Sequence, residues 1–165
     1  MTAVANRPLT LRSTLVGSVV VAGLIIAVLR QLDVIVVFSL VQKVPYIVLL
    51  QFIASGLLGP AAFAGGLGSA LLGLLLHVAF SLVIAVIFIL AATRLPVLRR
   101  NLILGGLLYG VVVYFVMNFV VTPLSAAPPP EAVSMWVIVE GIIGHALTIG
   151  LPLAFIARRM ANGGR

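Results

Sequence analysis

Long apolar runs are the feature that most limits how this chain can fold. The chain of 165 residues is 63% hydrophobic and only 8% charged, whereas a soluble domain carries about 25% charged residues. A membrane core about 30 Å thick is crossed by roughly 20 apolar residues in a helix. The runs therefore predict an all-α integral membrane protein, formed by residues 1–165 as a single transmembrane domain.

Four of these runs are long enough to cross a bilayer as helices. We expect the spans at about residues 14–41, 67–93, 102–122 and 132–157. The first run would be about 42 Å long at 1.5 Å per residue, so it must tilt, kink or protrude.

Polar ends and prolines are expected to bound the spans. Residues 1–13 form a short polar arm, and residues 158–165 form a polar, frayed tail. Pro123 is expected to end the third span and Pro152 to kink the fourth, because proline lacks a backbone donor and clashes with the preceding turn.

The apolar stretch between the first two spans is broken. Residues 44–58 are too few to cross easily, and the glycines and proline of residues 59–66 interrupt helices. We expect an interfacial or re-entrant segment, and the sequence leaves open which of the two it is. Gln51 and Ser55 lie four apart on one helical face. Whether these two side chains point inward or outward decides between two interpretations of the segment. It is either a gate above the polar groups or a plain interfacial helix that shields the bundle.

Basic residues are unevenly distributed around the four expected spans. Eight of the ten fall on one side, Arg30 lies within a span, and Lys43 is alone on the other side. The positive-inside rule then predicts a multi-pass protein with both termini in the cytoplasm. A fifth span through residues 44–65 would spoil this distribution. The net charge of +7 does not indicate nucleic-acid binding, because the basic residues form no patch with interleaved aromatics.

Small residues recur at spacings that permit close helix packing. Gly106 and Gly110 form a GxxxG pair, and Ser69 and Gly73 repeat the spacing. Such faces let helices approach closely. Besides the lipid bilayer, we therefore expect a possible partner in a second copy or another membrane protein, bound through Gly, Ala and Ser faces.

Seven polar side chains form a candidate buried polar layer. Counting at about 1.5 Å per residue places them from mid-membrane to about 9 Å outward. An ionisable group at the membrane centre costs about 2.5–3.5 kcal/mol, so these groups should face the bundle interior. The layer consists of Arg30, Asp33, His77, Ser81, Asn118, Glu140 and His145.

Spacing suggests which members of the layer meet. Arg30 and Asp33 share a face three residues apart and are predicted to pair. The pair is either a self-neutralising structural feature or part of a charge relay or ion site. Glu140 and His145, five apart, do not share a face.

The histidines His77 and His145 allow three interpretations. They are structural groups bonded within the bundle, a proton-handling pair, or axial ligands of a b-type haem between the second and fourth spans. No cysteine and only three acidic residues are present, and no catalytic motif is found. We therefore expect no enzyme, no catalytic residue, no metal site and, apart from the haem alternative, no cofactor.

Several segments resemble small bacterial membrane proteins. The segments are QFIASGLLGPAAFAGG at 51–66, GLLLH at 73–77, YGVVVYFVMNFVVTPLS at 109–125 and GHALTIGLPLAFIARR at 144–159. They are similar to an uncharacterised family of small bacterial inner-membrane proteins, and more distantly to the YagU-like proteins. The resemblance implies a bacterial inner-membrane location without an assigned reaction, and for YagU a loose association with acid tolerance. The chain lacks the longer insert that precedes the histidine-containing helix in the YagU-like proteins.

Three functions are consistent with these observations. The leading one is a non-enzymatic membrane scaffold or accessory subunit. The first alternative is a proton or small-solute transporter or channel that uses Asp33, His77, Glu140 and His145. The second is a haem-binding electron-transfer subunit. The sequence does not give the substrate, the partner or the oligomeric state.

Overall fold

The computed structural model describes residues 7–95, 98, 100–129 and 134–163, with side chains from residue 15 to residue 161 within these ranges. Residues 1–6 of the predicted arm and the predicted start of the fourth span at Ala132 and Val133 lie outside the described part. The basic residues Arg99 and Arg165 lie outside it too. All regular elements in the described part are helical. The predicted all-α class is therefore confirmed.

The chain alternates α-helices with short segments of other helical forms. The π-helices are η1 (Ile35–Val41), η3 (Met117–Val121) and η4 (Ala146–Gly150), and η2 (Gly59–Ala64) is a 3-10 helix. The α-helices are α1 (Arg7–Val34), α2 (Tyr46–Leu58), α3 (Gly66–Arg94), α5 (Leu102–Val116), α6 (Thr122–Leu124), α7 (Met135–His145) and α8 (Leu151–Gly163).

Five helical stretches of the described chain are long and apolar enough to cross a membrane. They are Leu15–Val41, Tyr46–Ala64, Gly66–Arg94, Leu102–Leu124 and Met135–Ala161. The fold is that of an all-α membrane protein. The four-plus-one arrangement does not follow from length and composition, because α2 and η2 together supply 19 residues. Residues 59–66, which were predicted to interrupt the helices, separate α2 from α3, and most of them form the 3-10 helix η2. Pro60 opens a 3-10 helix, where its missing N–H costs nothing.

Helices extend beyond three of the predicted boundaries. Residues 7–13 of the predicted arm belong to α1. The third span ends at Leu124, directly after Pro123, because η3 leads into the short helix α6, which places Pro123 in its first turn, where proline is tolerated. The predicted frayed tail is helical to Gly163, and arginines near a helix C-terminus interact favourably with the helix dipole.

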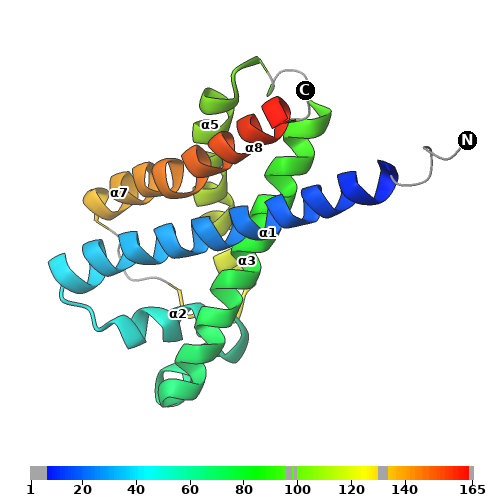
Figure 1. Cartoon of the computed structure of the whole chain (residues 1–165). Coiled ribbons are helices and arrows are strands. Elements are labelled where there is room, and N and C mark those ends of the chain that lie inside the picture. The colour runs from blue at the N-terminus through cyan, green and yellow to red at the C-terminus, as the bar shows by residue number, and fades with distance from the viewer. Residues whose placement is uncertain (1–6, 96–97, 99, 130–133, 164–165) are drawn as a thin grey trace, which may run out of the picture.

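The long helices pack at crossing angles, with α1 against α3 and α5 against η4 and α8. Figure 1 shows α1 running beside α7 and α8 in the opposite direction, with α3 crossing α1. The start of α1, the end of α3, the start of α5 and the end of α8 lie toward the upper right of this view, and α2 lies at the lower left. The core lies where these helices meet, and its fully buried members include Ile26, Phe88, Ile89 and Leu153.

Glycines allow the helix backbones to come very close together. A Cβ atom added to Gly106 would lie 2.4 Å from the carbonyl oxygen of Gly150, and one added to Gly110 would lie 2.4 Å from that of His145. A Cβ added to Gly73 would lie 1.9 Å from the carbonyl oxygen of Leu50. The predicted close contacts of these glycines are therefore confirmed, and they are made inside the chain.

The polar face of α2 turns toward the protein. Gln51 and Ser55 are both buried. The Gln51 amide donates to the carbonyl of Gly66 at 3.0 Å, and the Ser55 hydroxyl donates to the carbonyl of Phe52 at 2.7 Å. The two side chains are satisfied by backbone, so this segment provides no free polar group from this face.

We predict that Gly106→Ala lowers stability although it adds only a methyl group. That methyl group would meet backbone and force α5 away from η4, and overpacking of this kind costs about 1–3 kcal/mol. The measurement is thermal unfolding in detergent. Gly17→Ala is the matched control, because a Cβ there meets nothing within 4 Å and alanine is the better helix former. Equal midpoints for the two variants would contradict the close approach.

Candidate functional site

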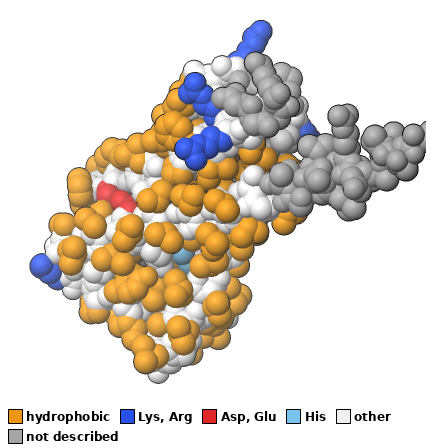
Figure 2. Space-filling view, in the orientation of Figure 1, with side chains coloured by type: hydrophobic (Ala, Val, Ile, Leu, Met, Phe, Trp, Pro, Cys, Tyr) orange, Lys and Arg blue, Asp and Glu red, His pale blue; other side chains and the backbone are white. Residues whose placement is uncertain are grey.

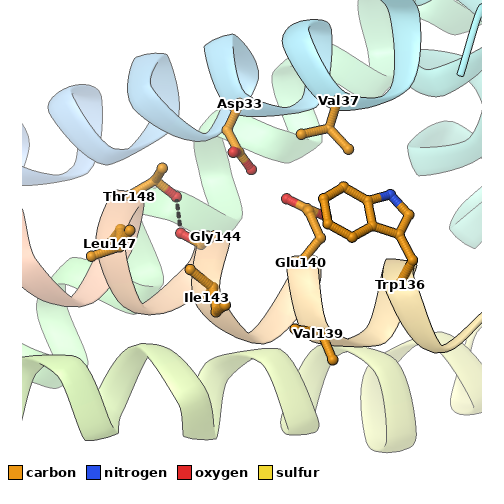
Figure 3. Close-up of a pocket in the computed structure, with 9 residues that line it drawn as sticks. All are labelled: Asp33, Val37, Trp136, Val139, Glu140, Ile143, Gly144, Leu147 and Thr148. Atoms are coloured by element: carbon orange, nitrogen blue, oxygen red, sulfur yellow. Dashed lines mark hydrogen bonds between the residues drawn. The ribbon is translucent and has the colours of Figure 1, made fainter. Parts of the chain in front are cut away.

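A cleft of about 220 Å³ lies between α1 with η1 and α7 with η4. Figure 3 shows Asp33 pointing into it from α1, and Glu140 and Trp136 pointing into it from α7. Apolar side chains make most of the remaining wall. The lining residues are Asp33, Val37, Trp136, Val139, Glu140, Ile143, Gly144, Leu147 and Thr148. This position of Trp136 was not predicted from the sequence, where its one signal is a lone tryptophan one helical turn before Glu140.

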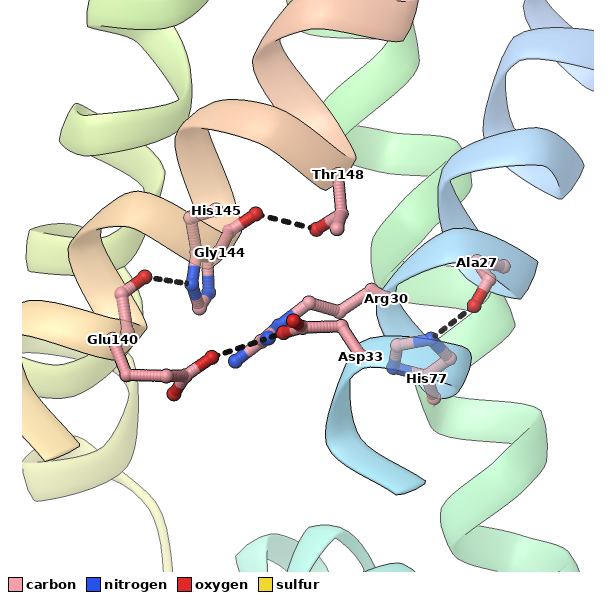
Figure 4. A network of polar contacts seen from close by, with 9 residues as sticks. Ala27, Arg30, Asp33, His77, Glu140, Gly144, His145 and Thr148 are labelled. Carbon is pink, nitrogen blue, oxygen red and sulfur yellow. Dashed lines mark hydrogen bonds and ion pairs between the residues drawn. The ribbon is translucent and has the colours of Figure 1, made fainter. Parts of the chain in front are cut away.

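An ionic cluster forms the inner wall of the cleft. The guanidinium of Arg30 is ion-paired with Asp33 on the same helix, which confirms the predicted pair. Glu140 approaches the same guanidinium from α7, with Nη1 and Oε1 3.9 Å apart (Figure 4). The structure therefore brings together three members of the predicted polar layer.

Gly144 makes room for this cluster. A Cβ atom at this position would lie 2.9 Å from a carboxylate oxygen of both Asp33 and Glu140, and 3.2 Å from the Arg30 guanidinium. No side chain larger than a hydrogen fits there without moving the charges. Gly144 follows Glu140 by four residues, and this i, i+4 spacing was the available sequence signal.

Glu140 lacks hydrogen-bond donors. Its side chain is 8% exposed, and neither carboxylate oxygen has a hydrogen-bond partner within the described residues. Arg30 is already paired with Asp33, so one guanidinium faces two carboxylates. A buried carboxylate without donors is unfavourable when charged, so this site favours uptake of a proton or another cation.

The cleft opens on an apolar surface. Asp33 and Glu140 are the acidic residues of the described chain. Figure 2 shows acidic side-chain atoms at the surface, surrounded by hydrophobic side chains and backbone, with most of the visible Lys and Arg side chains at the upper end of the molecule. The cleft therefore opens on the side of the bundle, and the Glu140 carboxylate oxygens are buried beneath that surface.

Both predicted histidines donate to backbone carbonyls. His77 Nε2 lies 3.1 Å from the carbonyl oxygen of Ala27, and His145 Nδ1 lies 2.7 Å from that of Gly141. The His145 ring also packs edge-on against Tyr114, with centroids 5.3 Å apart. In Figure 4, Arg30 and Asp33 lie between the two imidazole rings. This geometry gives the haem alternative no support.

The remaining two members of the predicted polar layer, Ser81 and Asn118, are not part of the ionic cluster. Ser81 is buried and donates to the carbonyl of His77 at 2.9 Å. Asn118 is exposed, and its amide donates to the carbonyl of Tyr114 at 2.9 Å. The prediction of a buried Asn118 is wrong. It lies in η3, where the wider π-helical turn changes the direction of each side chain relative to an α-helix.

Comparisons with family models, curated proteins and solved structures find no match to this chain. The resemblance to YagU-like proteins stays a prediction. The described residues contain no group of three or more His, Cys, Asp or Glu side chains arranged to hold a metal ion. The candidate site therefore depends on the geometry of the cleft alone.

We predict that removing the positive charge of the cluster lowers the stability of the protein, whereas removing the negative charge of Glu140 does not. Arg30→Met leaves two carboxylates without a cation, and breaking a buried pair in this way costs about 3–5 kcal/mol. Glu140→Gln removes a carboxylate that has no donor, so stability should be unchanged or higher. Unfolding of both variants in detergent at neutral pH tests this. A large destabilisation by Glu140→Gln would mean that Glu140 is well paired.

Proposed function

We propose that this chain is a small membrane transport protein that handles protons, with Glu140 as the group that takes up and releases the proton. The observation that carries the proposal is the burial of both Glu140 carboxylate oxygens without a hydrogen-bond donor, beside the Arg30–Asp33 pair. Placing an ionisable side chain inside a membrane helix costs free energy, and such side chains commonly mark proton and ion pathways.

The surroundings of Glu140 support a carboxylate that takes up and releases a proton rather than one that is permanently charged. Arg30 and Asp33 approach it from α1, and His145 lies on its own helix. His77 lies across the Arg30–Asp33 pair on α3, and Tyr114 from α5 packs against the His145 ring. Protonated Glu140 leaves the cluster neutral, whereas ionised Glu140 leaves one negative charge, because the other two charges cancel. A transport cycle can use these two states.

We also propose four membrane spans in a bacterial inner membrane, with α2 and η2 not crossing and both termini cytoplasmic. The start of α1 and the end of α3 lie toward the same end of the molecule in Figure 1, which supports two crossings between them rather than three. The exposed arginines Arg94, Arg100 and Arg158 support the same orientation, because positive charge accumulates on the cytoplasmic side.

The scaffold function predicted from sequence receives less support than transport. It rested on small-residue faces available to a partner. Gly73, Gly106 and Gly110 are occupied by contacts within the chain, whereas Gly17 and Gly68 have open space beside them. The transport proposal is likewise non-enzymatic.

We predict that Glu140→Gln reduces proton uptake at least tenfold. The assay reconstitutes the full chain in liposomes that contain a pH-sensitive dye, and applies an inside-negative potential. Lys43→Gln is the control, because it also removes one charge but at an exposed position away from the cleft. Flux equal to that of empty liposomes, or unchanged flux in Glu140→Gln, would overturn the proposal.

Topology can be tested directly because the chain contains no cysteine. Lys43→Cys and Arg100→Cys introduce single thiols at exposed positions. With four spans, a membrane-impermeant maleimide should label them from opposite sides of the membrane. With α2 and η2 as a fifth span, both positions would be labelled from the same side.

A further inference from the structure

The cleft combines an apolar wall with a concentration of negative charge. Val37, Ile143 and Leu147 present hydrocarbon to it, while Asp33 and Glu140 present carboxylates. Thr148 also lines the cleft, but its hydroxyl already donates a hydrogen bond to the carbonyl of Gly144 at 2.7 Å. The polar groups that remain for a ligand are therefore mostly acceptors, which selects for a positively charged or hydrogen-bond-donating molecule.

The unpartnered carboxylate identifies where such a charge would bind. Glu140 is more than nine-tenths buried, points into the cleft in Figure 3, and has no hydrogen-bond partner for either oxygen among the described residues. The nearest cation, the Arg30 guanidinium, lies 3.9 Å away and is paired with Asp33. A cation in the cleft would neutralise the charge that Arg30 leaves uncompensated.

The residues that line the cleft favour an organic cation over a metal ion. Hard metal cations take six or more oxygen ligands, and here the lining supplies two carboxylates among mostly aliphatic side chains. Trp136 adds an indole ring beside Glu140 in Figure 3. Tryptophan faces attract quaternary ammonium groups and other ligand cations by cation–π interaction. A cation with apolar substituents satisfies the carboxylate, the ring and the hydrocarbon wall together.

We propose that the cleft binds a hydrophobic organic cation, such as a quaternary ammonium compound or a protonated amine with an apolar body. Glu140 is its charge partner and Trp136 its aromatic wall. The volume of about 220 Å³ is below the range of roughly 300–1,000 Å³ for drug-sized ligands, so the ligand is small. The opening on the apolar surface gives it a route from the side of the bundle.

This inference rests on the proposed transport function and names its substrate class. Proton and organic cation compete for the Glu140 carboxylate, because each neutralises the same charge. The charged and titratable groups around that carboxylate are Arg30, Asp33, His77, Tyr114 and His145. Competition at one carboxylate is a direct way to couple the movement of two cations.

Trp136 is the only tryptophan of the chain, so its fluorescence reports on the cleft. The experiment titrates the full chain in detergent at neutral pH with benzyltrimethylammonium. Neopentylbenzene is the matched probe, because it has the same shape with carbon in place of nitrogen and carries no charge. We expect a saturable fluorescence change with the cation, binding of the neutral probe at least tenfold weaker, and weaker cation binding as the pH falls.

Variants assign the binding to the carboxylate. Glu140→Gln should weaken binding at least tenfold, Glu140→Asp should retain part of it, and Lys43→Gln should stay within twofold of the original protein. Circular dichroism checks that each variant is folded, and calorimetric titration covers the case of binding that leaves the indole unaffected. No saturable binding by either method, equal binding of the neutral probe, or full binding to folded Glu140→Gln would overturn the inference.

The outcome is separable from that of the proton-transport experiment. The titration uses neither a membrane nor a proton gradient, and the flux assay contains no organic cation. Proton flux without cation binding would overturn the substrate class and leave the proton function standing. Cation binding without proton flux would retain the site and overturn the proton function.

Discussion

The burial of Arg30 in an otherwise apolar bundle is the constraint on which the site depends. An arginine remains charged, so the surrounding helices must compensate for it wherever it lies. Asp33 does so from the same helix, and Glu140 approaches from α7 without reaching hydrogen-bond distance. The result is a cluster with one more acid than base, in which the second acid is the uncompensated member.

Backbone proximity, rather than interlocking of large side chains, sets this geometry. Gly106 and Gly110 bring α5 against η4, and Gly144 lets α7 lie against the ionic cluster of α1. The contacts of Gly106 and Gly110 involve main-chain atoms, so α5 and η4 have little freedom to slide, while Gly144 leaves the space in which Arg30, Asp33 and Glu140 meet. Pro152 is accommodated within the same region, because η4 widens the helix immediately before it.

Sequence reasoning predicted the parts of the site that depend on local spacing. The Arg30–Asp33 pair follows from i, i+3 geometry, and the separate directions of Glu140 and His145 follow from helical rotation. The cleft was not predictable in this way, because it depends on which helices cross and how closely. The predicted burial of Asn118 was wrong for a related reason. A π-helical turn changes the direction of the side chain, and such a turn leaves little trace in an apolar sequence. The continuation of α2 into η2 was missed because Gly59 and Pro60 were treated as terminators.

The position of the ion pair within a single helix has a consequence for how the protein is made. Arg30 and Asp33 emerge from the ribosome together and can neutralise each other before α7 is synthesised. Glu140 belongs to α7, which is synthesised after α1, α3 and α5, so its carboxylate meets Arg30 at a later stage. During synthesis the balanced pair therefore precedes the carboxylate that is left without a hydrogen-bond donor.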